Sequence, residues 1–291
     1  MWTKIGSEEF FTGTQIEWLE NLHNYWYHGE DDDISYVPFT EDEELAAECA
    51  SLAGEILMDE ETFIGSHLSE HMDKVRKYAN HEVFKRVALM NLEFGAANEL
   101  PACINKLGEC YFEGLLVPQD VKKAIEYFTE GVRLGSAASG INLGRIYEEG
   151  LLGSADRLRA AHEYGRAALM DNSAEALWRL GDLMAQGDDE LHDVLCAYHL
   201  YRKAQGHTCR GSLEASRVAL RLARMVSEPT LADAGIPYEP IRALGLFQAA
   251  EHGLRVYLMG HALSDTERLH FDVLITEAID GQERMRLACA C

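Results

Sequence analysis

Hydrophobic residues recur at spacings of three and four along most of the chain, which is the pattern of amphipathic helices. The clearest predicted helices form three consecutive pairs, over residues 98–113 and 120–134, 136–149 and 156–170, and 173–186 and 190–205. A looser fourth pair has its first helix over 211–225 and a second helix that begins near Glu239. Pro229 and the Gly235–Pro237 turn predict an inserted loop between these two helices. The pattern therefore predicts an all-α fold.

Both ends of the chain also show helical periodicity. We predict helices over 8–28, 41–58, about 66–79 and 82–94, and over 254–262 and 265–280. Ser264 and Glu267 are spaced as a capping box at the start of the last of these helices. The tail from Gly281 is expected to be a short helix or a frayed end. The expected divisions are an acidic, aromatic-rich helical N-terminal region (1–65), a helical array (66–253, clearest over 98–205) and C-terminal capping helices (254–291).

Two short motifs repeat within the paired helices. One has Leu and Gly followed by a large side chain and a second Gly, and the other has Asp, Ala and an aromatic residue at intervals of four. The first motif begins at Leu107, Leu143 and Leu180, and the second begins at Asp120, Asp156 and Asp193, so both advance by 36 and then 37 residues. A fixed period of this length predicts stacked helix–turn–helix units.

Each repeated residue has a physical reason to be there. Glycine inside a helix costs about 0.5–1 kcal/mol relative to alanine, so Gly108, Gly144 and Gly181 predict close approach of a neighbouring helix. We expect the alanines of the second motif (Ala124, Ala160, Ala197) to face these glycines, and the aromatic residues (Phe128, Tyr164, Tyr201) to fill the gap between layers. We expect the aspartates to cap the second helices, and the later glycines (Gly114, Gly150, Gly187) to end the first helices in the left-handed conformation.

These residues resemble the Sel-one-like repeat, a tetratricopeptide-type helix–turn–helix unit. Its pattern is matched best by Leu107–Gly114 followed by Asp120–Phe128, and the resemblance covers residues 98–253. It implies a right-handed α-solenoid that acts as a non-enzymatic scaffold or adaptor for a protein or peptide. Arrays of this kind need capping segments, so we expect residues 1–65 to form an acidic helical cap. The alternatives are that this region docks a partner or covers the groove.

Helical geometry predicts which residues of the first helices face outward to a partner. They form a stripe of mixed charge on the concave side: Lys106, Glu109, Glu113, Asn142, Arg145, Glu149, Arg179, Asp182 and Gln186. Trp178 lies at the edge of this stripe and is the best candidate for a single anchor, because tryptophan is enriched among interface hot spots. The alternative is that Trp178 packs against a neighbouring helix.

Charge is distributed unevenly along the chain. The net charge is −23, and residues 1–70 hold 18 acidic residues and one lysine, a net of −17. Because nucleic-acid affinity depends on lysine and arginine at phosphates, a nucleic-acid partner is not expected. Complementary charge favours a basic protein partner, and an inhibitor or immunity-type protein that covers a basic toxin or enzyme is one form of this. The alternative is that the acidic surface serves solubility.

Candidate chemistry is sparse. His67, Glu70 and His71 fit a zinc-hydrolase pattern in which two histidines share a helix face, and a zinc-dependent hydrolase is the alternative function. His192, Cys196 and His199 are also spaced for one helix face, and Cys209 is followed by Arg210, which lowers the pKa of a thiol. Five-residue matches occur easily by chance, and no phosphate-binding or dinucleotide motif is found. We therefore expect no enzyme activity, no metal and no cofactor.

The expected location is the cytoplasm. The seven cysteines stand at no regular spacing, and the repeats lack the paired cysteines of the secreted branch of the family that they resemble. Reduced thiols are typical of cytosolic proteins. The first residues do not follow the pattern of a secretory signal, and no apolar run reaches the roughly 18 residues that span a bilayer. The oligomeric state is left open.

Overall fold

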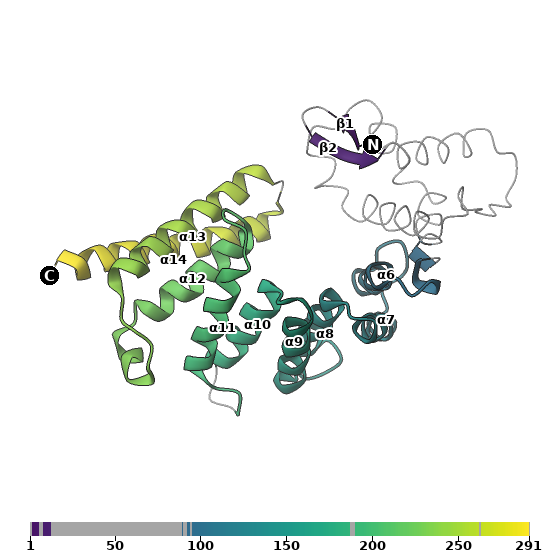
Figure 1. Cartoon of the computed structure of the whole chain (residues 1–291), viewed down its shortest axis with the longest axis horizontal. Helices are drawn as coiled ribbons and strands as arrows, with labels where there is room; N and C mark the ends of the chain where they lie inside the picture. Colours follow the sequence, from purple (N-terminus) through teal and green to yellow (C-terminus); the bar gives the residue numbers. More distant parts are fainter. Residues whose placement is uncertain are drawn as a thin grey trace, which may run out of the picture. The chain divides into compact units, whose positions relative to one another are not determined.

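The repeated motifs fold into consecutive helix hairpins (Figure 1). The structure, a computed structural model, describes residues 2–5, 8–12, 89, 92–93, 95–186, 190–261 and 263–290. The paired helices are α6 (Pro101–Glu113) and α7 (Val121–Arg133), α8 (Ala137–Glu149) and α9 (Arg157–Asp171), α10 (Ala174–Ala185) and α11 (Val194–Gly206), and α12 (Leu213–Val226) and α13 (Pro240–Gly260). The first three predicted pairs are confirmed, and none of their ends differs from the prediction by more than four residues.

The chain divides into two compact units, Met1–Gly135 and Ser136–Cys291. In the first unit, α6 packs against α7. In the second unit, each helix of a hairpin packs against its partner, and α9 and α11 also contact the first helix of the following hairpin. The predicted stacking of helix hairpins is therefore confirmed from α8 to α13.

The first residues form a β-hairpin. Strand β1 (Trp2–Ile5) pairs with β2 (Glu8–Thr12) in antiparallel fashion, with Trp2 opposite Thr12, and a register shift follows Thr3. The helix predicted over 8–28 therefore does not begin at Glu8. β-branched and aromatic residues favour strands, and both strands contain them, a signal that the helical periodicity of 8–28 concealed. The helices predicted over 41–58 and 66–79, and the part of the acidic cap that follows Thr12, lie outside the described residues.

The repeated glycines make room for an aromatic ring. A Cβ on Gly108 would lie 2.5 Å from the Phe128 ring, and a Cβ on Gly181 would lie 2.5 Å from the Tyr201 ring. Gly144 stands in the same relation to Tyr164. Close approach at these glycines is confirmed, but the prediction that alanines face them is wrong. The ring lies one turn beyond the alanine. Its flat edge reaches the backbone at the glycine, which the shorter alanine methyl group does not reach.

The predicted aspartate caps and the glycine ends at Gly114 and Gly150 are confirmed, and Gly187 lies outside the described residues. Asp120 accepts hydrogen bonds from the backbone N–H groups of Lys122 and Lys123, and Asp156 and Asp193 cap α9 and α11 in the same way. The backbone N–H of each aspartate also donates to a carbonyl of the preceding helix, as Asp156 does to Tyr147 at 2.8 Å. Gly114 and Gly150 end their helices with φ values of 75° and 67°. The capping aspartates therefore join the two helices of each hairpin as well as starting the second.

The C-terminal part differs from the prediction in two places. Helix α13 runs without a break to Gly260, so the separate helix predicted over 254–262 does not exist. Helix α14 (Asp265–Ala290) begins at the predicted Ser264–Glu267 capping box and continues past Gly281, which is not a frayed end. A Cβ on Gly281 would lie 2.5 Å from Phe247 of α13. The glycine–ring contact missing from the fourth hairpin is thus made one helix later, by α14.

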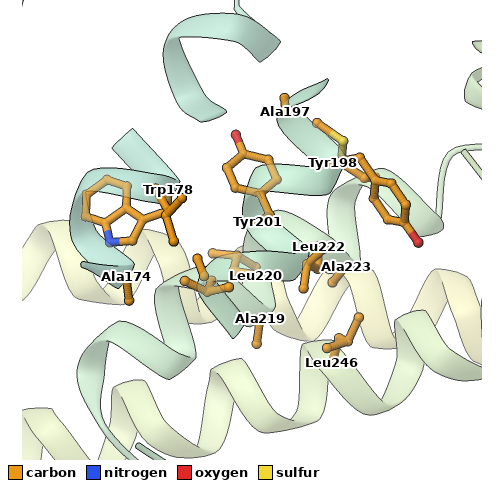
Figure 2. Packing of buried hydrophobic residues seen from close by; sticks show 14 of the residues in the cluster. Ala174, Trp178, Ala197, Tyr198, Tyr201, Ala219, Leu220, Leu222, Ala223 and Leu246 are labelled. Atoms are coloured by element: carbon orange, nitrogen blue, oxygen red, sulfur yellow. The ribbon is translucent and has the colours of Figure 1, made fainter. Parts of the chain in front are cut away.

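The largest hydrophobic cluster fills the space between the layers of the second unit. Figure 2 shows side chains from α10, α11, α12 and α13 converging, among them Trp178, Tyr201, Leu220 and Leu246. The inserted loop between α12 and α13 folds as a 3₁₀ helix, η1 (Pro229–Ala234), and places Ile236 in this core at 1% exposure. The layers are therefore held by one continuous set of apolar contacts.

A buried thiol makes the first unit sensitive to alkaline pH. Cys110 is fully buried, and burial raises the pKa of its thiol to about 12, with the Glu109 carboxylate adding to the shift. An unfolded cysteine titrates near ~8.5. The folded state therefore holds the thiol proton more tightly than the unfolded state does. The free energy of unfolding that this contributes is fully present below pH ~8.5 and is lost as pH rises toward 12, by up to about 1.4 kcal/mol per pH unit.

We expect Cys110→Ala to remove this part of the pH dependence. Urea unfolding at pH 8 and pH 10 should show a loss of stability that is about 1–2 kcal/mol smaller in the variant than in the wild-type protein. Cys209→Ala removes an exposed thiol and should follow the wild-type protein. Identical pH dependence in the wild type and Cys110→Ala would contradict this assignment.

Candidate functional site

The predicted stripe on the first helices is only partly exposed. Glu113, Glu149 and Gln186 lie exposed at the C-terminal ends of α6, α8 and α10. The other charged and amide side chains of the stripe are half-buried along these helices: Lys106, Glu109, Asn142, Arg145, Arg179 and Asp182. Several of them bind each other or their neighbours, as Lys106 does Glu109 at 3.1 Å. The structure thus leaves only the ends of the stripe fully open to a partner.

Trp178 is not an exposed anchor. It is 5% exposed and belongs to the core between α10 and α12. The guanidinium groups of Arg221 and Arg179 lie over its ring, 4.1 Å and 4.7 Å from the centroid. The anchor prediction is therefore wrong and the alternative, packing against a neighbouring helix, is confirmed. Helical spacing alone placed Trp178 at the edge of the stripe, and the stacking of the next hairpin covers that edge.

A tyrosine, an acid and an arginine connect successive layers. Tyr164 of α9 donates a hydrogen bond to Glu148 of α8 at 2.7 Å, and Arg179 of α10 lies 3.9 Å from the same carboxylate. Arg179 also binds Glu175 at 2.8 Å. Burial and the bond to Glu148 raise the pKa of Tyr164, while for Arg179 the surrounding acids outweigh burial and raise its pKa. Helices α8, α9 and α10 are therefore joined by a hydrogen bond and an ion pair that share the Glu148 carboxylate.

The same arrangement recurs one layer further along. Tyr201 of α11 donates to Asp182 of α10 at 2.7 Å, and Arg221 of α12 binds both oxygens of Asp182 at 2.6 Å and 2.5 Å. Burial and the Asp182 carboxylate raise the pKa of Tyr201. A second bidentate pair joins Arg224 of α12 to Glu277 of α14. Sequence reasoning missed these pairs, although the change from Phe128 to tyrosine in the two later repeats was a visible signal.

Arginines from two of these layers line a pocket of about 200 Å³. Its lining includes Arg179 of α10 and Arg217, Arg221 and Arg224 of α12, and Trp178 forms part of its base. Burial, and repulsion from Arg221, lower the pKa of Arg217. None of the residues that line this pocket is acidic. A strongly acidic chain therefore presents a locally basic hollow on its first helices.

A second, larger hollow lies at the loops that join the helices. It has a volume of about 470 Å³ and is lined by the α8–α9 loop, the start of α9 and the later part of the α10–α11 loop. Arg157 is part of this lining and donates to the carbonyl oxygens of Leu183 and Gln186, which ties α9 to the end of α10. Leu152 and Leu158 are exposed beside it. We assign no ligand to this hollow.

The candidate metal and catalytic residues do not come together in the described part of the chain. His192, Cys196 and His199 form no metal-binding group there, and no other cluster of three histidine, cysteine or acidic side chains does so within those residues. His67, Glu70 and His71 lie outside the described residues. Cys209 is exposed, as the prediction of a reactive thiol requires. No described helix is long and apolar enough to cross a membrane.

Comparison with protein-family models identifies the repeats. The Sel1 repeat model matches residues 101–136, 141–172 and 174–204. Residues 101–204 carry three Sel1 repeats. The matched segments coincide with the helix pairs α6–α7, α8–α9 and α10–α11. Sel1 repeats mediate contacts between proteins, and proteins built from them are typically scaffolds rather than catalysts.

Solved structures share this fold at low sequence identity. A Sel1 repeat protein from Oxalobacter formigenes aligns with a TM-score of 0.55 and 17% identity, covering 94% of this chain and 99% of that one. A protective antigen of uropathogenic Escherichia coli, c5321, which displays an SLR fold, aligns with a TM-score of 0.50 and 19% identity, covering 91% of this chain and 57% of that one. Both show the Sel1 fold of the chain and nothing about its ligand.

One curated relative shares part of the sequence. The alginate biosynthesis protein AlgK of Azotobacter vinelandii is 36% identical over 104 residues, which are 36% of this chain and 22% of the relative. The chain thus spans about a fifth of that protein's length. The match does not extend to the activity of the whole relative.

Proposed function

We propose that the chain is a non-catalytic scaffold that binds a protein partner on the face formed by its first helices. The observation that carries this proposal is the pairing of Sel1 hairpins with a polar first-helix face, where acids and arginines of α8, α10 and α12 are held in fixed positions. Ordered polar groups favour recognition because little side-chain freedom is lost on binding. We also propose a cytoplasmic location, supported by Cys196 and Cys209, which form no disulfide within the described residues.

The acidic first quarter of the chain suggests the charge of one region of the partner. Residues 1–70 carry a net charge of −17, and we propose that they attract a basic region of the bound protein. An inhibitor or immunity-type protein that covers a basic toxin or enzyme is one form of this function. Charge complementarity of this kind speeds association and is weakened by salt.

We expect affinity capture from the native cell extract to recover a specific protein whose yield falls as salt is raised from about 0.05 M to about 0.5 M. A double variant of exposed first-helix residues, Glu149→Ala with Gln186→Ala, should recover less of it. The matched control, Glu126→Ala with Gln205→Ala, removes the same two residue types from the exposed surfaces of α7 and α11 and should recover it fully. Equal loss of the captured protein in both variants would argue against the first-helix surface as the binding site. No captured protein at either salt concentration would argue against the scaffold function.

A further inference from the structure

The arginines of the small pocket differ in how their charges are balanced. Three of them bind a carboxylate outside the pocket lining: Arg179 with Glu175, Arg221 with Asp182, and Arg224 with Glu277. Arg217 makes no ion pair through its guanidinium in the part of the chain that the structure describes, and Arg221 donates only to its backbone carbonyl. The pocket therefore holds one arginine whose donors are not taken up by an acid of the described structure.

An unpaired cation in this position favours an incoming anion. Arg217 is half-buried, and its pKa is lowered by burial first and then by the positive charge of Arg221, with Glu175 partly opposing this shift and Arg179 adding to it. A desolvated charge without a partner is costly. Hydrogen bonds between a guanidinium and a carboxylate are short, strong and often bidentate, so a carboxylate placed here would offset that cost.

The rest of the pocket favours a peptide over a small ion. Leu220 and Leu254 line it and are 2% and 0% exposed, and Leu274 of α14 completes an apolar wall. His270 lies exposed on the same helix at the pocket rim. A volume of about 200 Å³ suits one or two side chains. A purely inorganic anion would leave the half-buried Leu274 side chain uncovered.

We propose that this pocket binds an acidic segment of the protein partner, with a carboxylate on Arg217 and an adjacent apolar side chain against Leu274. This proposal rests on the scaffold function proposed above and adds the chemistry of one contact. It concerns a different surface from the acidic first quarter of the chain, which attracts the basic region of the partner.

Titration of the full chain with a fluorescein-labelled peptide tests the proposal. The probe is a hexapeptide of alternating Glu and Leu, and its control carries Gln in place of every Glu. We expect saturable binding of the acidic peptide only, and a loss of about tenfold to a hundredfold in affinity for Arg217→Gln, as for a lost hydrogen bond to a charged group. Arg202→Gln removes the same charge from the exposed surface of α11 and should bind as the wild-type protein does.

Several outcomes would overturn the pocket assignment. They are equal binding of the Gln peptide, equal weakening by Arg202→Gln, and displacement of the peptide by inorganic phosphate but not by chloride at the same ionic strength, which would mark a phosphate site. Thermal unfolding followed by circular dichroism checks that Arg217→Gln is folded. If Arg217→Gln retains the captured partner as well as the wild-type protein does, the pocket inference fails while the scaffold function stands.

Discussion

Gly144→Ala should destabilise the second unit by about 1–3 kcal/mol, although alanine is the better helix former by about 1 kcal/mol. A Cβ on Gly144 would lie 2.6 Å from Cδ1 of Tyr164. That ring is fully buried, and its hydroxyl is held by Glu148 at 2.7 Å. It therefore cannot swing away without breaking a partly buried hydrogen bond, and α8 and α9 must move apart instead. Chemical unfolding followed by circular dichroism measures the effect.

Gly165→Ala is the matched control. Gly165 also lies within a helix of this hairpin, α9, and a Cβ there would meet no atom within 4 Å. This variant should be more stable than the wild-type protein by about 0.5–1 kcal/mol, because only the helix propensity changes. Equal stability of the two variants would show that the glycine–ring contact does not set the spacing of the helices.

Asp182→Ala should cost about 3 kcal/mol, the lower end of the range for breaking a buried ion pair, since 19% of this side chain and 16% of Arg221 stay exposed. The change removes both bonds to Arg221 and the bond from the Tyr201 hydroxyl. It leaves a half-buried guanidinium over the Trp178 ring without its acid. Urea unfolding of the purified protein would measure the loss.

A double variant separates the charge from the packing. Asp182→Ala combined with Arg221→Met should recover part of the lost stability, because the uncompensated charge is removed along with its partner. Glu130→Ala breaks an exposed carboxylate–guanidinium pair, with Arg133 on α7, and should cause no measurable change. Simple additivity of the Asp182→Ala and Arg221→Met effects would contradict the coupling of these two side chains.

The polar contacts between layers also explain why an acidic chain can present a basic pocket. Asp182 and Glu277 bind the arginines of α12 from outside the pocket lining. These carboxylates neutralise the charges of Arg221 and Arg224, and their acceptor oxygens are occupied by those two guanidinium groups. The remaining guanidinium donors, with Arg217, are then available to a ligand. The net charge of −23 therefore does not describe the surface that the first helices offer.

The local elements of this protein could be read from the sequence. The Asp120, Asp156 and Asp193 caps, the left-handed Gly114 and Gly150, and the three helix pairs depend on residues within a few positions of each other. Helix periodicity and capping are local properties, so they can be recognised in a single sequence. The period of 36 and 37 residues also predicted that the hairpins stack, because each repeated unit must bury the same face against the next unit.

Contacts between layers were decided only by the tertiary structure. Periodicity showed that the residues around Trp178 share a helix, but not that α12 would cover its ring. It could not show that the arginine pocket combines α10 and α12 with Leu254 and Leu274, or that Gly281 would supply the contact missing from the fourth hairpin. Such contacts join residues tens of positions apart, and their pairing depends on how whole side chains fill the space between helices.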